Sequence, residues 1–210
     1  PQTSKEILVM MRDAVRRADT IIRGMLDFSR PAPLRLKPGS LADVIESSLL
    51  LVEKPMESKR IHLTRTFGKD VPQVSFDENQ MKQVFINLMM NAVHAMPRGG
   101  QLSVRCRTRV LDARDPLVGR RSADSFKSGT PVVVAEVADS GAGIPKEKLS
   151  TVFNPFFTTK PPGEGTGLGL AVTRSIVENH KGRIVLESEL GVGTTVTITL
   201  PTDAGGETHG

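Results

Sequence analysis

The sequence predicts an α/β (α+β) two-layer sandwich, in which helices cover one face of a mixed, mainly antiparallel sheet and a long N-terminal helix precedes it. Two observations lead to this fold class. Segments with helical periodicity alternate with strand-type segments from residue 41 to residue 200. The last two strand-type segments flank the short run Gly191-Val192-Gly193, which is typical of a hairpin and therefore of antiparallel pairing.

The bulk composition is typical of a soluble globular protein with one or two domains. The chain has 210 residues, of which 38% are hydrophobic and 24% charged. No apolar run approaches the roughly 20 residues that span a membrane, and no signal peptide is present, so we expect a cytoplasmic segment without a membrane span. Because residue 1 is not Met, we expect a piece of a longer protein, which can be membrane-anchored elsewhere.

Cysteine content and charge limit the compartment and the classes of partner that we expect. The single cysteine, Cys106, excludes a disulfide within the chain and fits a reducing compartment. The net charge is +5, and much of the excess lies in one stretch, at Arg105, Arg107, Arg109, Arg114, Arg120, Arg121 and Lys127. A nucleic-acid surface is one interpretation. Because the chain has no Trp or Tyr to stack on bases, we favour a solvated surface and expect no nucleic-acid partner.

The first thirty residues predict one helix with an apolar seam. The seam residues alternate spacings of three and four: Leu8, Met11, Val15, Ala18, Ile22 and Met25. This spacing favours a coiled coil or helix bundle with a second helix, in this chain or in another copy. The alternative is a helix packed on the core of its own domain. Prolines at 31 and 33 end the helix and begin an extended linker over residues 31–39.

The main domain is expected over residues 40–201. Its first half contains a helix over 41–57 capped by Ser40, a strand over 61–67, and an amphipathic helix over 77–96. The apolar face of that second helix comprises Met81, Val84, Phe85, Leu88, Met89, Ala92 and Ala95. Strands are expected over 102–110 and 132–138, separated by about twenty polar residues, a loop that is long for a compact domain.

The second half continues with shorter elements. A short helix is expected over 145–152, an irregular candidate lid over 154–166, and a helix over 168–180. The hairpin strands cover 184–187 and 194–200. Residues 202–210 are expected to be a disordered tail.

Two glycine clusters predict a phosphate site. They are Asp139-Ser-Gly141-Ala-Gly143 and Gly163-Glu-Gly165-Thr-Gly167-Leu-Gly169. Glycine lets backbone amides approach a bulky anion, because no Cβ stands in the way. The second cluster runs directly into a helix, whose N-terminal amides and dipole favour phosphate. We therefore expect a phosphorylated ligand of nucleotide size.

Polar residues elsewhere fit the same ligand. Asn87 and Asn91 are four residues apart on the helix over 77–96, so both amides leave one face, followed by His94. Amide oxygens suit Mg²⁺ that shares ligands with phosphates. A structural asparagine pair is the alternative for this helix alone. Asp139 ends a strand, where an ionised carboxylate can accept a hydrogen bond from an exocyclic amine such as that of adenine.

Two common nucleotide motifs are absent. The chain has no P-loop spacing, and Gly165-Thr166-Gly167 is followed by Leu170 where the dinucleotide fingerprint requires glycine.

The motifs together resemble those of sensor histidine kinases. Asn87-Leu-Met-Met-Asn91-Ala-Val-His94 resembles their N box, and the two glycine clusters resemble the G1 and G2 boxes. Phe156-Phe-Thr-Thr-Lys160 resembles the F box, and Gly191-Val-Gly193-Thr194 the final glycine box. All five occur in the family's order. The resemblance is strongest to the nitrogen-regulator type, within the superfamily with the Bergerat ATP-binding fold.

The resemblance implies roles for the matching positions. Asp139 would accept from the adenine amine, with Thr194 nearby. Asn91 would bind Mg²⁺, Asn87 would contribute to the ion or the phosphates, and Asn87, His94 and Lys160 would form the catalytic set. The full implied set for ATP is Asn87, Asn91, His94, Asp139, Gly141, Gly143, Ile144, Phe156, Phe157, Thr158, Lys160, Gly165, Thr166, Gly167, Leu168, Gly169 and Thr194. Phe156 and Phe157 would anchor the base of the lid.

The resemblance also implies partners. Residues 1–30 resemble the second helix of the dimerisation and phosphoacceptor hairpin, so we expect a homodimer in the full-length protein and transfer of phosphate to its own hairpin. A response-regulator receiver domain would then take the phosphate onto an aspartate. The phosphoacceptor histidine is expected to precede residue 1, because none of His62, His94, His180 and His209 lies in the family's acceptor motif.

Three alternatives remain at this point. One is a conformational ATPase like gyrase B, Hsp90 or MutL, although these have a Glu where this chain has Asn87. The second is a serine kinase of the anti-sigma type, which the apolar N-terminal seam helix disfavours. The third, a nucleic-acid-binding module, would use the Arg-rich strand.

Overall fold

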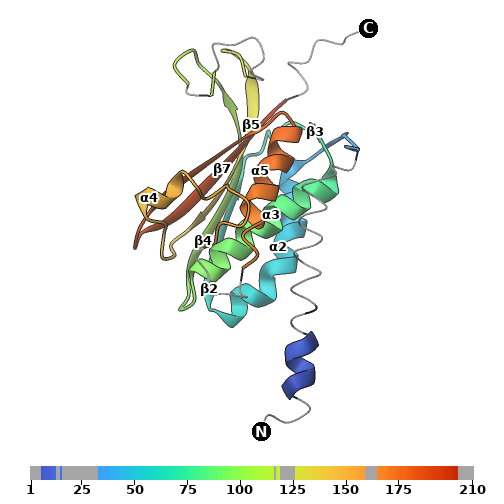
Figure 1. Ribbon diagram of the computed structural model, residues 1–210. Coiled ribbons are helices and arrows are strands. Elements are labelled where there is room, and N and C mark those ends of the chain that lie inside the picture. The colour runs from blue at the N-terminus through green and yellow to red at the C-terminus, as the bar shows by residue number, and fades with distance from the viewer. Residues whose placement is uncertain are drawn as a thin grey trace.

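A computed structural model of the chain describes residues 6–12, 15, 33–115, 117–118, 126–158 and 165–202. Its main feature is a five-stranded sheet in the order β2-β4-β5-β7-β6 (Figure 1). The strands are β2 (Ile61–Phe67), β4 (Gly100–Val110), β5 (Pro131–Asp139), β6 (Arg183–Glu189) and β7 (Gly193–Pro201). Within this sheet as described, only β2 and β4 pair in parallel, and the other three pairs are antiparallel. The predicted mixed, mainly antiparallel sheet is therefore confirmed.

Three longer helices pack together on one face of this sheet (Figure 1). They are α2 (Leu41–Ser58), α3 (Glu78–Ala95) and α5 (Gly169–Asn179), and a short helix α4 (Lys146–Leu149) follows β5. Alternate residues of β5, namely Val133, Ala135 and Val137, join the apolar faces of the helices in one core. The apolar face predicted for α3 is buried from Met81 to Ala92, and Ala95 is half-buried. The two-layer sandwich is thus confirmed.

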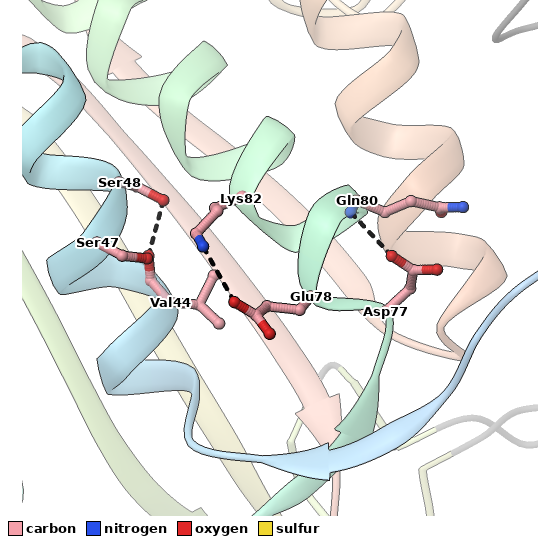
Figure 2. A network of polar contacts seen from close by, with 7 residues as sticks. All are labelled: Val44, Ser47, Ser48, Asp77, Glu78, Gln80 and Lys82. Carbon is pink, nitrogen blue, oxygen red and sulfur yellow. Dashed lines mark hydrogen bonds and ion pairs between the residues drawn. The ribbon is translucent and has the colours of Figure 1, made fainter.

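A second, small sheet was not predicted. Strand β1 (Lys37–Gly39) pairs antiparallel with β3 (Val74–Phe76). Residues 37–39 belong to the segment expected as a linker, so its last residues join the folded domain. This small sheet lies where α2 and α3 begin. Ser40 caps α2 as predicted, because its Oγ accepts from the N–H of Asp43 at 3.2 Å. Asp77, predicted as the first residue of the next helix, is the N-cap of α3, and its Oδ1 accepts from the N–H of Gln80 at 3.1 Å (Figure 2).

The long segment between β4 and β5 is less polar in its packing than its composition suggested. Leu111 and Phe126 are buried and form a separate cluster with Val132 and Val134 of β5. Val132 and Val134 alternate with the residues of β5 that face the helices, so this cluster covers the other face of the sheet. The two ends of the loop are therefore anchored by apolar contacts.

The chain ends differ partly from expectation. Residues 6–12 and 15 are helical, and the seam residues Leu8, Met11 and Val15 have exposed side chains. The remainder of the expected 1–30 helix lies outside the described residues. Thr202, expected to begin a disordered tail, is instead buried, and its hydroxyl donates to the carbonyl of Pro131 at 3.0 Å. Among the residues described, no helix combines the length and apolar character needed to cross a membrane.

Candidate nucleotide-binding site

The C-terminal half of α3 lies at the centre of the predicted site. Asn87 and Asn91 are half-buried and His94 is exposed, whereas Leu88, Met89 and Ala92 between them are buried in the core. Asn87 faces the start of α5, because its Nδ2 donates to the carbonyl of Gly169 at 3.5 Å. This bond leaves Oδ1 of Asn87 available as an acceptor or metal ligand.

The first glycine turn packs against the end of α3. The N–H of Ala142 donates to the carbonyl of Ala95 at 3.1 Å. A Cβ on Gly141 would lie 2.7 Å from the Ala95 Cβ. This contact is too close for any side chain at residue 141, so glycine is required for the turn to reach the helix. The sequence did not reveal this partner, because no pattern marks a backbone carbonyl.

The same turn also packs against the hairpin of β6 and β7. Gly143 has φ +66°, and a Cβ there would lie 2.0 Å from the carbonyl oxygen of Glu189. The N–H of Gly191 donates to the carbonyl of Ala142 at 2.8 Å. The final glycine box and the first glycine turn therefore form one packed unit, although about fifty residues separate them.

Three polar side chains form a row at the end of the sheet. Asp139 of β5 pairs with Thr194 of β7, which pairs with Ser188 of β6. Ser188 is two residues beyond Leu186, which packs on the core, so the row lies on the helix side of the sheet. These three residues line an open hollow of about 330 Å³.

Ser188 is a member of the site that sequence reasoning missed. Its Oγ accepts from the N–H of Ile144 at 2.8 Å and lies 2.9 Å from the hydroxyl of Thr194. It also lies 2.8 Å from the carbonyl oxygen of Gly193, to which it can donate. Ser188 thus holds the glycine turn in place beside Thr194. The predicted strand ended at residue 187, and nothing in the sequence marked Ser188 as a contact of Ile144, 44 positions away.

The Asp139 carboxyl is in an environment that disfavours its charge. Burial raises the pKa of Asp139 above its ordinary value, and the backbone N–H groups of Gly141 and Thr194 only partly oppose this effect. The distance from the Gly141 nitrogen to Asp139 Oδ1 is 2.8 Å. A carboxylate with so little compensation gains from a further hydrogen-bond donor.

The base of the predicted lid is held through its backbone. Gly167 has φ +66°, and a Cβ there would lie 2.4 Å from the carbonyl carbon of Phe156. Phe156 is 56% exposed, and its backbone packs against Gly167 of the second glycine cluster. Phe157 is half-buried and Thr158 is exposed. Lys160 lies outside the described residues.

The second glycine cluster ends at the N-terminus of α5. Thr166 Oγ1 accepts from the N–H of Leu168 at 3.3 Å, Leu168 is buried, and helix α5 begins at Gly169. Gly165, Thr166, Gly167 and Gly169 are half-buried. The amides of the first helical turn lack partners within the helix, as in any α-helix, and therefore suit an anion.

A larger hollow, of about 620 Å³, lies elsewhere. It is lined by residues around the starts of α2 and α3, such as Arg35, Ser40, Asp77 and Lys82, and includes none of the predicted nucleotide residues. Volume alone would favour this larger hollow as the ligand site. Chemistry points to the smaller hollow, because Asp139 and Thr194 line it and both glycine turns adjoin α3.

Comparisons with known proteins agree with this arrangement. Residues 76–204 match the family described as histidine kinase-, DNA gyrase B-, and HSP90-like ATPase. The sensor histidine kinase ZraS of Salmonella typhimurium is 35% identical over 198 residues, which are 94% of this chain. The chain spans only 38% of the length of ZraS.

Two solved structures are similar in fold. Histidine kinase ThkA, in complex with the response regulator protein TrrA, has a TM-score of 0.68 and 26% identity over 96% of this chain and 52% of that chain. Full-length ShkA in complex with AMPPNP has a TM-score of 0.73 and 20% identity, covering 96% of this chain and 39% of that chain. Since the family match covers more than half of the sequence, this chain belongs to the family of histidine kinase-, DNA gyrase B-, and HSP90-like ATPases.

Proposed function

We propose that this chain is the ATP-binding catalytic part of a two-component sensor histidine kinase. Residues 37–202 would be the catalytic domain, because β1 and Thr202 join its fold. Residues 31–36 would be the linker, and residues 1–30 part of the dimerisation and phosphoacceptor hairpin. The observation that carries the proposal is the convergence on α3: the first glycine turn bonds to Ala95, and the start of α5 bonds to Asn87. The similarity to ZraS favours this function over the other members of the family.

Asp139 would recognise the adenine ring. Its carboxylate can accept the exocyclic amine, and Thr194 and Ser188 line the same hollow. A hydrogen bond to a charged group in a partly buried site contributes about 1.5–3 kcal/mol. Gly141 and Gly143 support this role indirectly, because a Cβ at either residue would collide with Ala95 or Glu189 and displace the turn that follows Asp139. The complex of ShkA with AMPPNP supports an adenine nucleotide as the ligand.

Residues from α3 and α5 would hold the phosphates and Mg²⁺. The amide oxygens of Asn91 and Asn87 are hard ligands that suit Mg²⁺, which when bound neutralises charge that develops on the transferred phosphoryl group. Asn87 is oriented for this role, because its Nδ2 is directed at Gly169 and its oxygen is left for the ion. The N-terminal amides of α5 would bind phosphate oxygens, with His94 and Lys160 as further cationic or donor groups.

The nucleophile would come from another segment. In the transfer, an imidazole nitrogen bonds to the γ-phosphorus while the bond to the bridging oxygen breaks and ADP leaves. His180 is buried with both ring nitrogens in hydrogen bonds, and His62 lies in strand β2. We therefore assign neither histidine as the group that receives the phosphoryl group. A hairpin histidine would receive the phosphoryl group and a receiver-domain aspartate would then take it. The complex of ThkA with the response regulator TrrA supports such a partner.

A transfer experiment in trans tests the proposal. The chain is mixed with ATP labelled in the γ-phosphate, Mg²⁺ and a separate dimerisation hairpin from a nitrogen-regulator-type kinase. We expect the hairpin to acquire acid-labile, base-stable label, as phosphohistidine does. Matched controls are a hairpin whose acceptor histidine is replaced by Gln and the chain with Asp139→Asn, neither of which should give label. Absence of label with a chain that binds ATP would argue for an ATPase of another kind.

A further inference from the structure

His180 connects the end of α5 to the start of α3. It follows the last residue of α5 and is only 5% exposed. Its Nδ1 lies 2.7 Å from the carbonyl oxygen of Ile176, and its Nε2 lies 2.9 Å from the backbone nitrogen of Asp77. Asp77 is 103 residues away in sequence and caps α3. One side chain therefore bonds to both helices that carry the proposed phosphate-binding groups.

The two bonds define the state of the ring. A carbonyl oxygen can only accept, so Nδ1 must carry the hydrogen. A backbone N–H can only donate, so Nε2 must be the unprotonated acceptor. His180 is therefore held as the neutral imidazole with hydrogen on Nδ1. Because both nitrogens are used, the ring position is fixed relative to each helix.

Asp77 extends this connection to the segment before β1. Its Oδ1 accepts from the N–H of Gln80 in the first turn of α3 at 3.1 Å (Figure 2). Its Oδ2 accepts from the N–H of Arg35, also at 3.1 Å. The backbone N–H of Asp77 thus bonds to His180 at the end of α5, and its carboxylate bonds to α3 and to the segment before β1. We refer to Asp77 and His180 with these bonds as the junction.

Helices α3 and α5 run antiparallel and are bonded at two points. The start of α3 meets the end of α5 at the junction, and ten residues further along α3 Asn87 meets Gly169 at the start of α5. At 1.5 Å per residue, the two points lie roughly 15 Å apart along both helices. The junction bond is 2.9 Å long, whereas the Asn87–Gly169 bond is 3.5 Å long. The short, buried bond at the junction is therefore the stronger constraint on how the helices align.

We infer that His180 is a positioning residue for nucleotide binding, which acts from the junction by setting the alignment of α3 against α5. This inference rests on the proposed function, because it assumes that Asn87 and Asn91 on α3 and the first amides of α5 hold one nucleotide. A slip of either helix would change the separation between these two groups of ligands. Nucleotide affinity therefore depends on a hydrogen bond far from the ligand.

Two amide substitutions separate the bonds of His180. In His180→Gln, the side-chain oxygen reaches the position of Nε2 and can accept from the N–H of Asp77. In His180→Asn, the shorter amide lies near the position of Nδ1, so it can donate to the Ile176 carbonyl but does not reach Asp77. We expect His180→Gln to bind ADP within about twofold of wild type and His180→Asn to bind about tenfold more weakly.

The control is Thr173→Val on the same helix. The Thr173 side chain is fully buried, and its hydroxyl has no hydrogen-bond partner among the described residues. Replacing the hydroxyl by a methyl group perturbs α5 without touching the junction, so ADP affinity should stay unchanged. Calorimetric titration with ADP and urea unfolding are measured for all four proteins. Equal ADP affinities of the Asn and Gln variants would overturn the inference, and a wild type that binds no ADP would refute the proposed function instead.

A second measurement needs no variant, in case His180→Asn does not fold. Coupling is reciprocal: if opening the junction weakens ADP binding about tenfold, saturating ADP must suppress that opening about tenfold. Hydrogen exchange of the Asp77 amide through local opening should slow by this factor when ADP is added. An exchange rate unaffected by ADP would show that the junction does not position the nucleotide groups.

Discussion

Two aspartates at opposite ends of α3 have opposite electrostatic environments. Asp77 caps the start of the helix. Burial pushes its pKa upward, but the backbone N–H groups of Gln80, Arg35 and Asn79 outweigh burial, and the net pKa is lowered. Asp139 lies in the turn that packs on the end of α3, and there burial dominates, so its pKa is raised.

The difference separates a carboxylate that the fold compensates from one that would gain a hydrogen-bond donor from the proposed nucleotide. Asp77 is compensated by hydrogen bonds within the fold, so its charge stabilises the folded state. The charge of Asp139, beside an open hollow, is only partly offset by hydrogen bonds within the fold. Its ionisation therefore lowers the stability of the folded state unless a ligand supplies a further hydrogen-bond donor. On the proposed function, the carboxylate near the end of α3 would bind the nucleotide, whereas Asp77 stabilises the start of the helix.

The largest expected effect is that of Asp139→Asn. The amide N–H₂ group would face the adenine amine, donor against donor, and we expect ADP and ATP affinity to fall on the order of a hundredfold or more. A group whose folded-state pKa is raised destabilises the fold when ionised, so the nucleotide-free variant should unfold at a higher temperature than wild type at neutral pH. Calorimetry and thermal unfolding measure the two effects. Asp112→Asn, on an exposed loop residue, is the control, and retained affinity in Asp139→Asn would refute its role.

The next effect concerns the close approach of the first glycine turn. Gly143→Ala places a Cβ 2.0 Å from the Glu189 carbonyl oxygen, whereas Gly191→Ala meets nothing within 4 Å. Both residues have positive φ, so both variants bear a strain of about 1–2 kcal/mol. We expect Gly143→Ala to lose roughly 2 kcal/mol more in the free energy of unfolding, measured in urea. Equal losses would mean that backbone conformation alone requires Gly143.

Asn91→Ala should have a smaller and more selective effect. If Asn91 binds Mg²⁺, the variant should keep its affinity for ADP without the ion. The increase in ADP affinity that Mg²⁺ produces should be about tenfold smaller than in wild type. Asn79→Ala is the matched control, because it removes the same side chain from the exposed first turn of the same helix. A normal Mg²⁺ effect in Asn91→Ala would remove this residue from the metal site.

The smallest effect is the pH dependence contributed by Asp77. Because its folded-state pKa is lowered, its stabilisation is present above the unfolded pKa of about 3.9 and is lost as pH falls through the folded value. Asp77→Asn keeps the oxygen that caps Gln80 but removes the charge and the acceptor for the N–H of Arg35, so it should cost about 1 kcal/mol near pH 6. The difference from wild type should shrink as pH decreases below about 4, as measured by urea unfolding. A constant difference would show that Asp77 acts without its charge.

The periodic elements and the motif residues were predictable from sequence. The face of α3 from Met81 to Ala92 repeats often enough to define a helix, and Asp77 and Ser40 mark helix starts by local hydrogen bonding. The glycine clusters were visible because their spacing is local. Of the predicted site, the structure brings Asp139 beside Thr194 and Asn87 beside Gly169.

What the sequence left open depends on contacts between distant residues. Strands β1 and β3 have three residues each, too few for a period, and form only by pairing with each other. Phe126 is buried because β5 offers Val132 and Val134, although its neighbours in sequence are polar. Ser188 and His180 gain their roles from partners 44 and 103 positions away. No local pattern carries that information.

The central claim is that one pocket around α3 binds an adenine nucleotide with Mg²⁺, and calorimetric titration tests it most directly. ADP and ATP are titrated into the chain with and without Mg²⁺ at neutral pH. We predict saturable binding of both nucleotides, strengthened by Mg²⁺ and lost in Asp139→Asn. No binding heat at millimolar nucleotide with Mg²⁺ present, for a chain that is folded, would contradict the account.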